Sequence, residues 1–283
     1  IFFILRQLNT KKDIISQKLY SIIGMLWRSI MGKAIVFTSG KGGVGKTTVT
    51  LCVGKAIARE GKRVALVDAD TGLNNLDILL GAERSIVFDL SDVEAGRCRL
   101  KQALVSCGDL YLLSCGDNGN LDAKFLITSV EELKRYFDYV LIDCPAGIEY
   151  GFYRCALASD SAVVVTSAHL SALKDAAKVI TLIKSYGKDA TMIINRMRGD
   201  FLLDGGITVE EIRESLGTDV IGILPENDDL NKISGGESEV SGEGAAAVKM
   251  IADNITCGSR NLFDVTKRYR GIFGSIKRRL KRL

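Results

Sequence analysis

The stretch SGKGGVGKTT, Ser39 to Thr48, has the residue types and spacing of a phosphate-binding loop. Gly40 and Gly45 occupy the two glycine positions of the motif G-x-x-x-x-G-K-[ST], and Lys46 and Thr47 complete it. Glycines let the backbone turn its N–H groups inward around phosphate oxygens. Lys46 would then neutralise the β- and γ-phosphates, and the Thr47 hydroxyl would bind Mg²⁺.

The sequence around this loop favours a phosphate site over the alternative, a glycine-rich turn without a ligand. The run AIVFTS, 34–39, predicts a strand directly before the loop, and residues 46–60 predict a helix directly after it. This strand–loop–helix order is the setting that the motif requires, and the start of a helix favours an anion. The predicted ATP-binding residues of the loop are Gly40, Lys41, Gly42, Gly43, Val44, Gly45, Lys46, Thr47 and Thr48.

Three aspartates at predicted strand ends are candidates for a magnesium site. Asp68 and Asp70 end the run VALVDAD, and Asp143 follows the run YVLI. Ligands of α/β sheets bind at the carboxyl ends of the strands, so these carboxylates would lie beside the loop. An aspartate at a strand end can also mark nothing more than a turn. Two such runs together with a complete loop favour carboxylates that hold Mg²⁺ and position the attacking water.

Lys41 is a second lysine in the loop, where the motif needs only Lys46. The simplest interpretation is a solvated side chain at one of the free positions of the motif. Spacing alone does not reject that interpretation.

Short apolar runs alternate with helical patterns from Met31 onward, which predicts a doubly wound α/β domain with a mostly parallel sheet. The predicted strands are 34–39, 63–70, 110–114, 139–144, 161–167, 191–195 and 220–225. The predicted helices include 46–60, 128–137, 170–186 and 243–257. We expect three parts: an extension 1–30, an ATPase domain 31–258, and a linker with a C-terminal helix 259–283.

The composition excludes several classes of protein. The chain has 283 residues and seven cysteines, whose scattered spacing predicts reduced thiols rather than a disulfide framework or a metal site. No apolar run is long enough to span a membrane. The net charge is +4, but the basic residues are concentrated at the two ends and the body is acidic. We therefore expect no nucleic acid on the main surface, and an anionic partner at the ends.

The two ends differ in what they predict. In residues 1–30, apolar residues recur at helical spacing, but Met31 stands just before the first strand. We expect Met31 to be the natural start; a regulatory or membrane-contacting arm is the alternative. Residues 264–283 hold eight Lys and Arg against one Asp. A helix there would place Ile272, Phe273, Ile276, Leu280 and Leu283 on one side and Lys277, Arg278 and Arg279 on the remainder. This favours binding to an anionic membrane surface over a solvated helix, a docked helix or a DNA-binding arm.

The segments SGKGGVGKTT, DADTGLNNLDILLG (68–81) and DCPAGIE (143–149) resemble the deviant Walker A ATPases of the ParA/MinD family, in particular its septum site-determining members. The similarity extends from about Met31 to the C-terminus. The resemblance implies that Lys41 reaches across an ATP-bound dimer to the partner's phosphates, that Asp70 positions the hydrolytic water, and that Asp68 and Asp143 hold the Mg²⁺ shell. It also implies that adenine lies near Asn195, Arg196, Pro225, Glu226 and Asn227.

The function implied by this resemblance is a Mg²⁺-dependent ATPase that places the division septum. It would form a homodimer with ATP, attach peripherally to the cytoplasmic face of the cell membrane, recruit the inhibitor MinC and respond to a stimulator such as MinE. Three other functions of the same superfamily stay open: an FlhG-like flagellar-number regulator, a ParA-type DNA-partitioning ATPase and an iron–sulfur reductase. One segment departs from the family, because Ser167-Ala168-His169 replaces the usual N-P-E. We expect His169 to be a surface loop residue.

Overall fold

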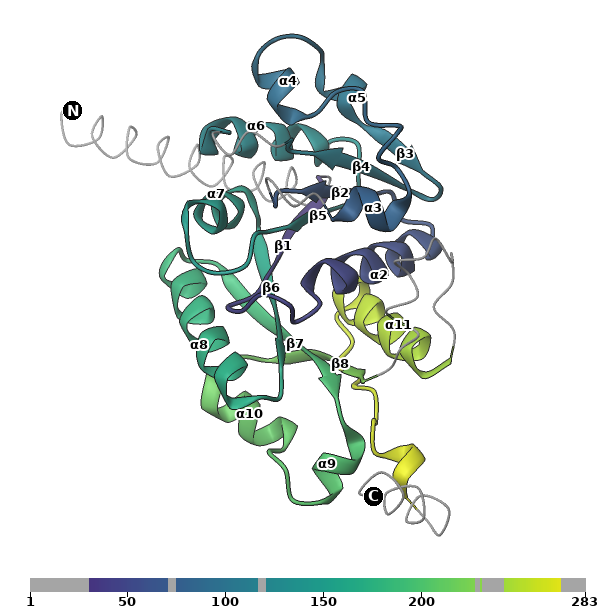
Figure 1. The fold of residues 1–283 in the computed structure, drawn as a ribbon, viewed down its shortest axis with the longest axis vertical. Coiled ribbons are helices and arrows are strands. Elements are labelled where there is room, and N and C mark those ends of the chain that lie inside the picture. The colour runs from purple at the N-terminus through teal and green to yellow at the C-terminus, as the bar shows by residue number, and fades with distance from the viewer. Residues whose placement is uncertain (1–30, 71–74, 117–120, 227–229, 231–241, 271–283) are drawn as a thin grey trace, which may run out of the picture.

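The predicted strands assemble into one sheet whose carboxyl ends meet beside the glycine-rich loop (Figure 1). A computed structural model describes residues 31–70, 75–116, 121–226, 230 and 242–270. The extension 1–30, Asn227 and the predicted membrane-binding residues Ile272, Phe273, Ile276, Lys277, Arg278, Arg279, Leu280 and Leu283 lie outside the described residues.

The sheet has eight described strands in the order β3-β4-β2-β5-β1-β6-β7-β8. Only β3 is antiparallel, since it pairs with β4 as a short edge, and the other pairs are parallel. The strands are β1 Lys33–Thr38, β2 Val64–Asp68, β3 Val105–Cys107, β4 Leu110–Ser114, β5 Tyr139–Asp143, β6 Ser161–Ser167, β7 Asp189–Met197 and β8 Val220–Pro225. The prediction of a mostly parallel, doubly wound α/β sheet is confirmed.

Helices cover both faces of this sheet (Figure 1). They are α2 Lys46–Arg59, α3 Leu76–Leu80, α4 Leu90–Glu94, α5 Leu100–Ala103, α6 Ala123–Leu133, α7 Tyr150–Ala158, α8 Leu170–Ser185, α9 Gly199–Leu203, α10 Val209–Leu216 and α11 Gly242–Cys257, with a short 3₁₀ helix, η2 Lys267–Tyr269. Alternate residues of β1 show the two layers: Val36 packs with α6, α7 and α8, and Phe37 packs with α2 and α11. Because both faces are buried, the strands are continuous apolar runs.

The sequence predicted the central strands within about two residues at each end. It was wrong about one helix, because 128–137 was predicted and α6 spans Ala123–Leu133. Asp122 begins α6, since its side chain accepts a hydrogen bond from the backbone N–H of Lys124. The antiparallel strand β3 and the helix α7 were not predicted.

After α11 the chain crosses to α9 and packs there. Val265 and Tyr269 are buried, and a Cβ atom on Gly199 would lie 2.0 Å from the Val265 carbonyl oxygen. The Arg268 guanidinium forms a 3.1 Å ion pair with Glu243 and lies 4.8 Å from the centre of the Tyr269 ring. These contacts fix the last described residues against the domain.

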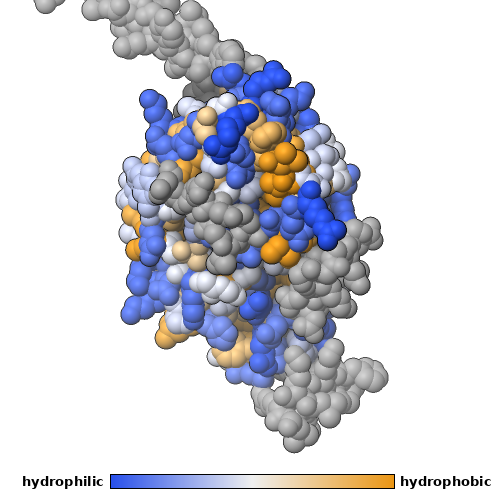
Figure 2. Space-filling model, turned by 45° about the horizontal axis from the view of Figure 1, so that its top comes forward, coloured by the Kyte–Doolittle hydropathy of each residue, from blue (hydrophilic) through white to orange (hydrophobic). Residues whose placement is uncertain are grey.

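On the face shown in Figure 2, the described residues are mostly hydrophilic, and hydrophobic ones form small separate patches. Within the described ranges, no helix is both long and apolar enough to cross a membrane.

Candidate active site

The phosphate-binding loop connects the buried strand β1 to helix α2, as the sequence predicted. Gly43 and Gly45 have φ angles of 77° and 87°, in the left-handed region that favours glycine. A Cβ atom on Gly45 would also lie only 2.5 Å from Nδ2 of Asn195. Glycine is therefore needed here both for the turn and for the close approach of β7. Helix α2 begins at Lys46, so its N-terminal N–H groups lie at the end of the loop.

Asp143, at the end of β5, is the centre of the buried polar network. It accepts hydrogen bonds from Lys46 Nζ at 2.8 Å, Thr47 Oγ1 at 2.7 Å and Thr50 Oγ1 at 3.2 Å. Burial alone would lower the pKa of Lys46, but the adjacent Asp143 carboxylate outweighs it and raises that pKa above its ordinary value. Lys46 is thus a fully charged lysine held at the loop.

Asp68 lies beside Asp143 because β2 and β5 pair in parallel with these two residues in register. It accepts hydrogen bonds from the backbone N–H groups of Asp70, Asn75 and Leu76, at 3.0 to 3.2 Å. Burial, followed by the charge of Asp143, raises the pKa of Asp68 to about 7. Burial also raises the pKa of the half-buried Asp70, partly opposed by the charge of Lys46. The structure therefore brings all three predicted aspartates to one end of the sheet.

The donor set fits Mg²⁺ and a nucleotide phosphate. Thr47, Asp68 and Asp143 offer the hard oxygen ligands that Mg²⁺ prefers, while the loop glycines and Lys46 offer N–H groups and positive charge. In the part of the chain that the structure describes, no group of three or more His, Cys, Asp or Glu side chains forms a complete metal site. Mg²⁺ is usually bound by one or two carboxylates together with substrate phosphates and water.

Two consecutive residues at the end of β7 hold the loop. Asn195 Nδ2 donates to the Val44 carbonyl oxygen at 2.8 Å, and an Arg196 guanidinium nitrogen donates to the Gly43 carbonyl oxygen at 3.2 Å. Arg196 has a φ of 55°, the one positive value among the described non-glycine residues. These contacts give Asn195 and Arg196 a role in shaping the loop, and their predicted place near adenine stays a prediction.

The other residues predicted near adenine lie at the end of β8. Pro225 is the buried last residue of that strand. Glu226 is exposed; its backbone N–H donates to the Met197 carbonyl oxygen, and its carboxylate lies 3.9 Å from Nε of Arg198. Thr48, the remaining loop residue of the prediction, lies half-buried in the first turn of α2.

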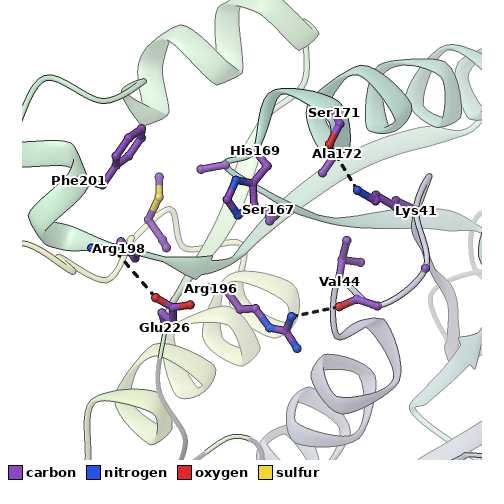
Figure 3. Close-up of a pocket in the computed structure, with 14 residues that line it drawn as sticks. Lys41, Val44, Ser167, His169, Ser171, Ala172, Arg196, Arg198, Phe201 and Glu226 are labelled. Atoms are coloured by element: carbon purple, nitrogen blue, oxygen red, sulfur yellow. Dashed lines mark hydrogen bonds and ion pairs between the residues drawn. The ribbon is translucent and has the colours of Figure 1, made fainter.

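A cavity of about 540 Å³ opens beside the loop (Figure 3). Its lining residues come from the loop, the β6–α8 connection, the end of β7 with α9, and the end of β8: Lys41, Gly42, Gly43, Val44, Ser167, Ala168, His169, Ser171, Ala172, Arg196, Met197, Arg198, Phe201 and Glu226. The Lys41 ammonium lies 3.4 Å from the Ser171 hydroxyl, at the start of α8. Lys41 thus extends toward α8, whereas Lys46 is bound to Asp143.

His169 immediately precedes α8 and is exposed, which confirms the prediction of a surface loop residue. With Ser167 and Ala168 it replaces the usual N-P-E of the family, and all three residues line the cavity. The departure from the family therefore lies beside the phosphate-binding loop.

Sequence reasoning missed two buried polar residues around the aspartates. Thr50 bonds to Asp143 and to the Lys46 carbonyl oxygen, and its position four residues after Lys46 was the available signal. Arg154 of α7 donates to the Ala69 carbonyl oxygen at 3.4 Å. An arginine within the apolar run YGFYRCALA was the corresponding signal.

Four of the seven cysteines, Cys52, Cys115, Cys144 and Cys155, are buried. Cys115 and Cys144 are completely buried, and burial raises the pKa of Cys115 to about 12. All seven cysteines are free thiols. A cluster bridged between two subunits requires thiols at the surface, so the burial of Cys115 and Cys144 disfavours these two residues as ligands of an iron–sulfur reductase.

The position of the phosphate-binding loop at the end of a central parallel strand defines the class of protein as a P-loop nucleotide-binding ATPase. The model of the CobQ/CobB/MinD/ParA nucleotide-binding domain matches residues 35–240. The septum site-determining protein MinD of Bacillus subtilis is 38% identical over 261 residues, which cover 87% of this chain and 97% of that protein.

Solved structures agree with this class. A chain of the MinC:MinD cell division protein complex of Aquifex aeolicus is 37% identical, with a TM-score of 0.76 over 82% of this chain and 98% of that chain. MinD of Pyrococcus horikoshii, complexed with Mg-ADP, is 28% identical, with a TM-score of 0.72 over 80% of this chain and 96% of that chain. The chain belongs to the MinD/ParA family of ATPases, within which it is of the MinD type. ATP and Mg²⁺ are its cofactors, and the flagellar-number and DNA-partitioning alternatives are disfavoured.

Proposed function

We propose that this chain is an ATP-driven switch that places the division septum, acting as an ATP-dependent homodimer on the cytoplasmic face of the cell membrane. The observation that supports this most directly is the different setting of the two loop lysines. Lys46 is 7% exposed and bonded to Asp143, whereas Lys41 is exposed at the rim of the cavity. This difference supports a role for Lys46 at the subunit's own phosphates and a role for Lys41 at those of a second subunit.

The residues of one subunit have distinct tasks. When bound, Mg²⁺-ATP supplies the phosphoanhydride bond that water cleaves to give ADP and phosphate. The loop N–H groups and Lys46 hold the phosphates, and Asp143 keeps Lys46 and the Thr47 hydroxyl in place. Asp70 accepts a hydrogen bond from the attacking water and orients it. The raised pKa of Asp70 makes its carboxylate a better proton acceptor than an ordinary aspartate.

Attachment to the membrane depends on the C-terminal tail, residues 271–283, which combines basic residues with an apolar stripe and lies outside the described residues. The burial of Val265 and Tyr269 supports this role, because it anchors the residues that precede the tail on the domain. Each basic residue near an anionic leaflet contributes about 1 kcal/mol, so one tail binds weakly and reversibly. Two tails on one dimer bind together, and this avidity raises the affinity by about 10²–10⁴. ATP-dependent dimerisation therefore controls attachment without a change in the tail.

The partner of the bound dimer is a MinC-like division inhibitor. A relative with 37% identity and the same fold is described in a MinC:MinD complex, which supports this partner. A MinE-like protein would stimulate hydrolysis and so release the dimer. The acidic body and apolar-striped tail support a lipid surface rather than nucleic acid as the anionic partner.

The test is sedimentation of the full chain with anionic vesicles, with Mg-ADP and with Mg²⁺ and a slowly hydrolysed ATP analogue. We expect a larger bound fraction with the analogue, and loss of binding in Ile276→Glu, which places a charge in the apolar stripe. Zwitterionic vesicles are the matched control and should retain little protein. Equal binding with ADP and with the analogue would refute the switch.

A further inference from the structure

Arg154 is a buried arginine on α7, with 1% of its surface exposed. One terminal guanidinium nitrogen donates to the Leu121 carbonyl oxygen at 3.3 Å, and the other donates to the Ala69 carbonyl oxygen at 3.4 Å. Ala69 follows β2, and Leu121 precedes α6. The planar fork of one arginine therefore bridges two connections that follow the neighbouring strands β2 and β4.

The Ala69 carbonyl belongs to the peptide unit that joins Ala69 to Asp70. The N–H of that same unit donates to Oδ1 of Asp68 at 3.2 Å. The preceding N–H, that of Ala69, donates to the Asp143 carbonyl oxygen at 2.9 Å. Arg154 thus holds the oxygen side of a peptide unit whose nitrogen side is held by an aspartate of the site. A peptide plane bonded at both sides cannot rotate freely, so the direction in which the Asp70 side chain leaves the backbone is set.

The Arg154 guanidinium is charged and buried, so its hydrogen bonds to the backbone carry a large energetic weight. A charge that is 1% exposed is expensive to bury, and an apolar side chain of similar length would fill the same space among apolar neighbours. Carbonyl acceptors offset part of that cost, and the strength of a charged donor in a buried setting makes the backbone contacts rigid. One of these contacts is to the carbonyl oxygen of the residue that directly precedes Asp70.

We infer that Arg154 is a positioning residue for ATP hydrolysis, acting through the Ala69–Asp70 peptide to orient the Asp70 carboxylate. The inference rests on the proposed role of Asp70 in holding the attacking water. The two carbonyl groups that Arg154 holds, those of Leu121 and Ala69, belong neither to the phosphate-binding loop nor to Asp143, so we expect nucleotide binding to survive its replacement. Its loss affects turnover rather than affinity.

The test compares steady-state ATP hydrolysis by the full chain in five forms: wild type, Arg154→Met, Arg154→Lys, Asp70→Asn and the double variant Arg154→Met/Asp70→Asn. A misplacement of a catalytic group by about 1 Å can cost about 10²-fold in rate, so we expect Arg154→Met to lower kcat by roughly 10- to 100-fold, with KM within about twofold. Lysine has one terminal nitrogen, so Arg154→Lys should regain part of the loss. The double variant should be no slower than Asp70→Asn, because Arg154 acts through Asp70.

Asn254→Leu is the matched control. Asn254 of α11 is likewise buried, and its Nδ2 bridges two carbonyl oxygens, those of Ile221 at 2.9 Å and Asn261 at 2.7 Å, remote in sequence from the aspartates. The variant Asn254→Leu should lower the melting temperature as Arg154→Met does, but leave kcat unchanged. An equal loss of kcat in the control would show general destabilisation and overturn the inference.

The remaining outcomes distinguish a wrong role for Asp70 from a wrong inference about Arg154. Wild-type kcat in Asp70→Asn contradicts the proposed role of Asp70 itself. Loss of kcat in Asp70→Asn with wild-type kcat in Arg154→Met overturns the inference about Arg154 alone. The inference about Arg154 is also overturned if the loss of kcat in the double variant equals the product of the losses in the two single variants. If Arg154→Met does not fold, Arg154→Lys decides: a lowered kcat with unchanged KM supports the inference, and wild-type kcat overturns it.

Discussion

At the scale of single residues, one carboxylate organises the site. Asp143 bonds to three side chains of α2: Lys46, Thr47 and Thr50. The network already holds the lysine and the hydroxyl beside the loop, so little side-chain ordering is required when a nucleotide binds. This organisation lowers the entropic cost of binding.

The buried thiols give a prediction at the same scale. Burial raises the pKa of Cys52 and Cys115 to about 12, and Cys144 and Cys155 are also fully buried, whereas Cys257 is exposed. The thiolate is the reactive form, so a shift of about three pKa units lowers reactivity by about 10³-fold at pH 8 even without the steric barrier. We expect a disulfide reagent such as DTNB to label Cys257 in the fast phase and to spare the four buried thiols until denaturant is added.

Cys257→Ser is the control for this measurement and should remove one thiol from the fast phase, while the partly exposed Cys98 and Cys107 can still react before the buried thiols. Labelling of the buried thiols of the native chain at the rate of Cys257 would contradict the packing described for α2, β5 and α7.

At the scale of elements, the sheet was predictable because its strands are buried on both faces and are therefore continuous apolar runs. Helix α7 was missed because its run YGFYRCALA has no clear polar face. Helix α10 carries a capping box, in which Thr208 and Glu211 bond reciprocally, and this signal was visible in the sequence. Strand β3 depends on pairing with β4, a tertiary contact that its three residues do not predict.

The junction of the loop with β7 gives a prediction for Gly45→Ala. The new Cβ would be strained at a φ of 87° and would displace Asn195 from the Val44 carbonyl. Left-handed strain costs about 1–2 kcal/mol of unfolding free energy. Distortion of the loop should also weaken ATP binding by roughly tenfold or more, which corresponds to about 1.4 kcal/mol. Urea denaturation and titration calorimetry measure the two effects.

Gly61→Ala is the matched control, because Gly61 has a φ of 79° and open space around it. It should show the loss of stability without the loss of ATP affinity. Wild-type ATP affinity in Gly45→Ala would mean that the contact between Asn195 and the loop is unimportant for binding.

At the scale of the whole molecule, the sequence predicted which residues reach the end of the sheet, but not how they meet. The apolar runs predicted that Asp68, Asp70 and Asp143 lie at the carboxyl ends of their strands. The pairing of β2 with β5 confirms that these ends lie side by side. The contacts of Asn195 and Arg196 with the loop join residues more than 150 positions apart, and local patterns do not contain such information. The bridge from Arg154 to Ala69 is likewise tertiary.

The switch also belongs to this scale, because it requires two copies of the chain. Lys41, at the rim of the cavity, would complete the partner's phosphate site, and the segment that precedes the tail is fixed on the same domain. Dimerisation, hydrolysis and membrane attachment are therefore expected to depend on one another. A variant that interrupts the first should interrupt all three.

The most direct measurement is sedimentation velocity of Lys41→Ala with Mg²⁺ and a slowly hydrolysed ATP analogue. Wild type should sediment as a dimer with the analogue and as a monomer with ADP. Lys41→Ala should remain a monomer with both while keeping wild-type affinity for ADP, since Lys46 and Asp143 are untouched. The control Lys124→Ala removes an exposed lysine outside the loop, on α6, and should form the dimer with the analogue as wild type does. A dimer of Lys41→Ala with the analogue would contradict the role of the second lysine in joining the subunits.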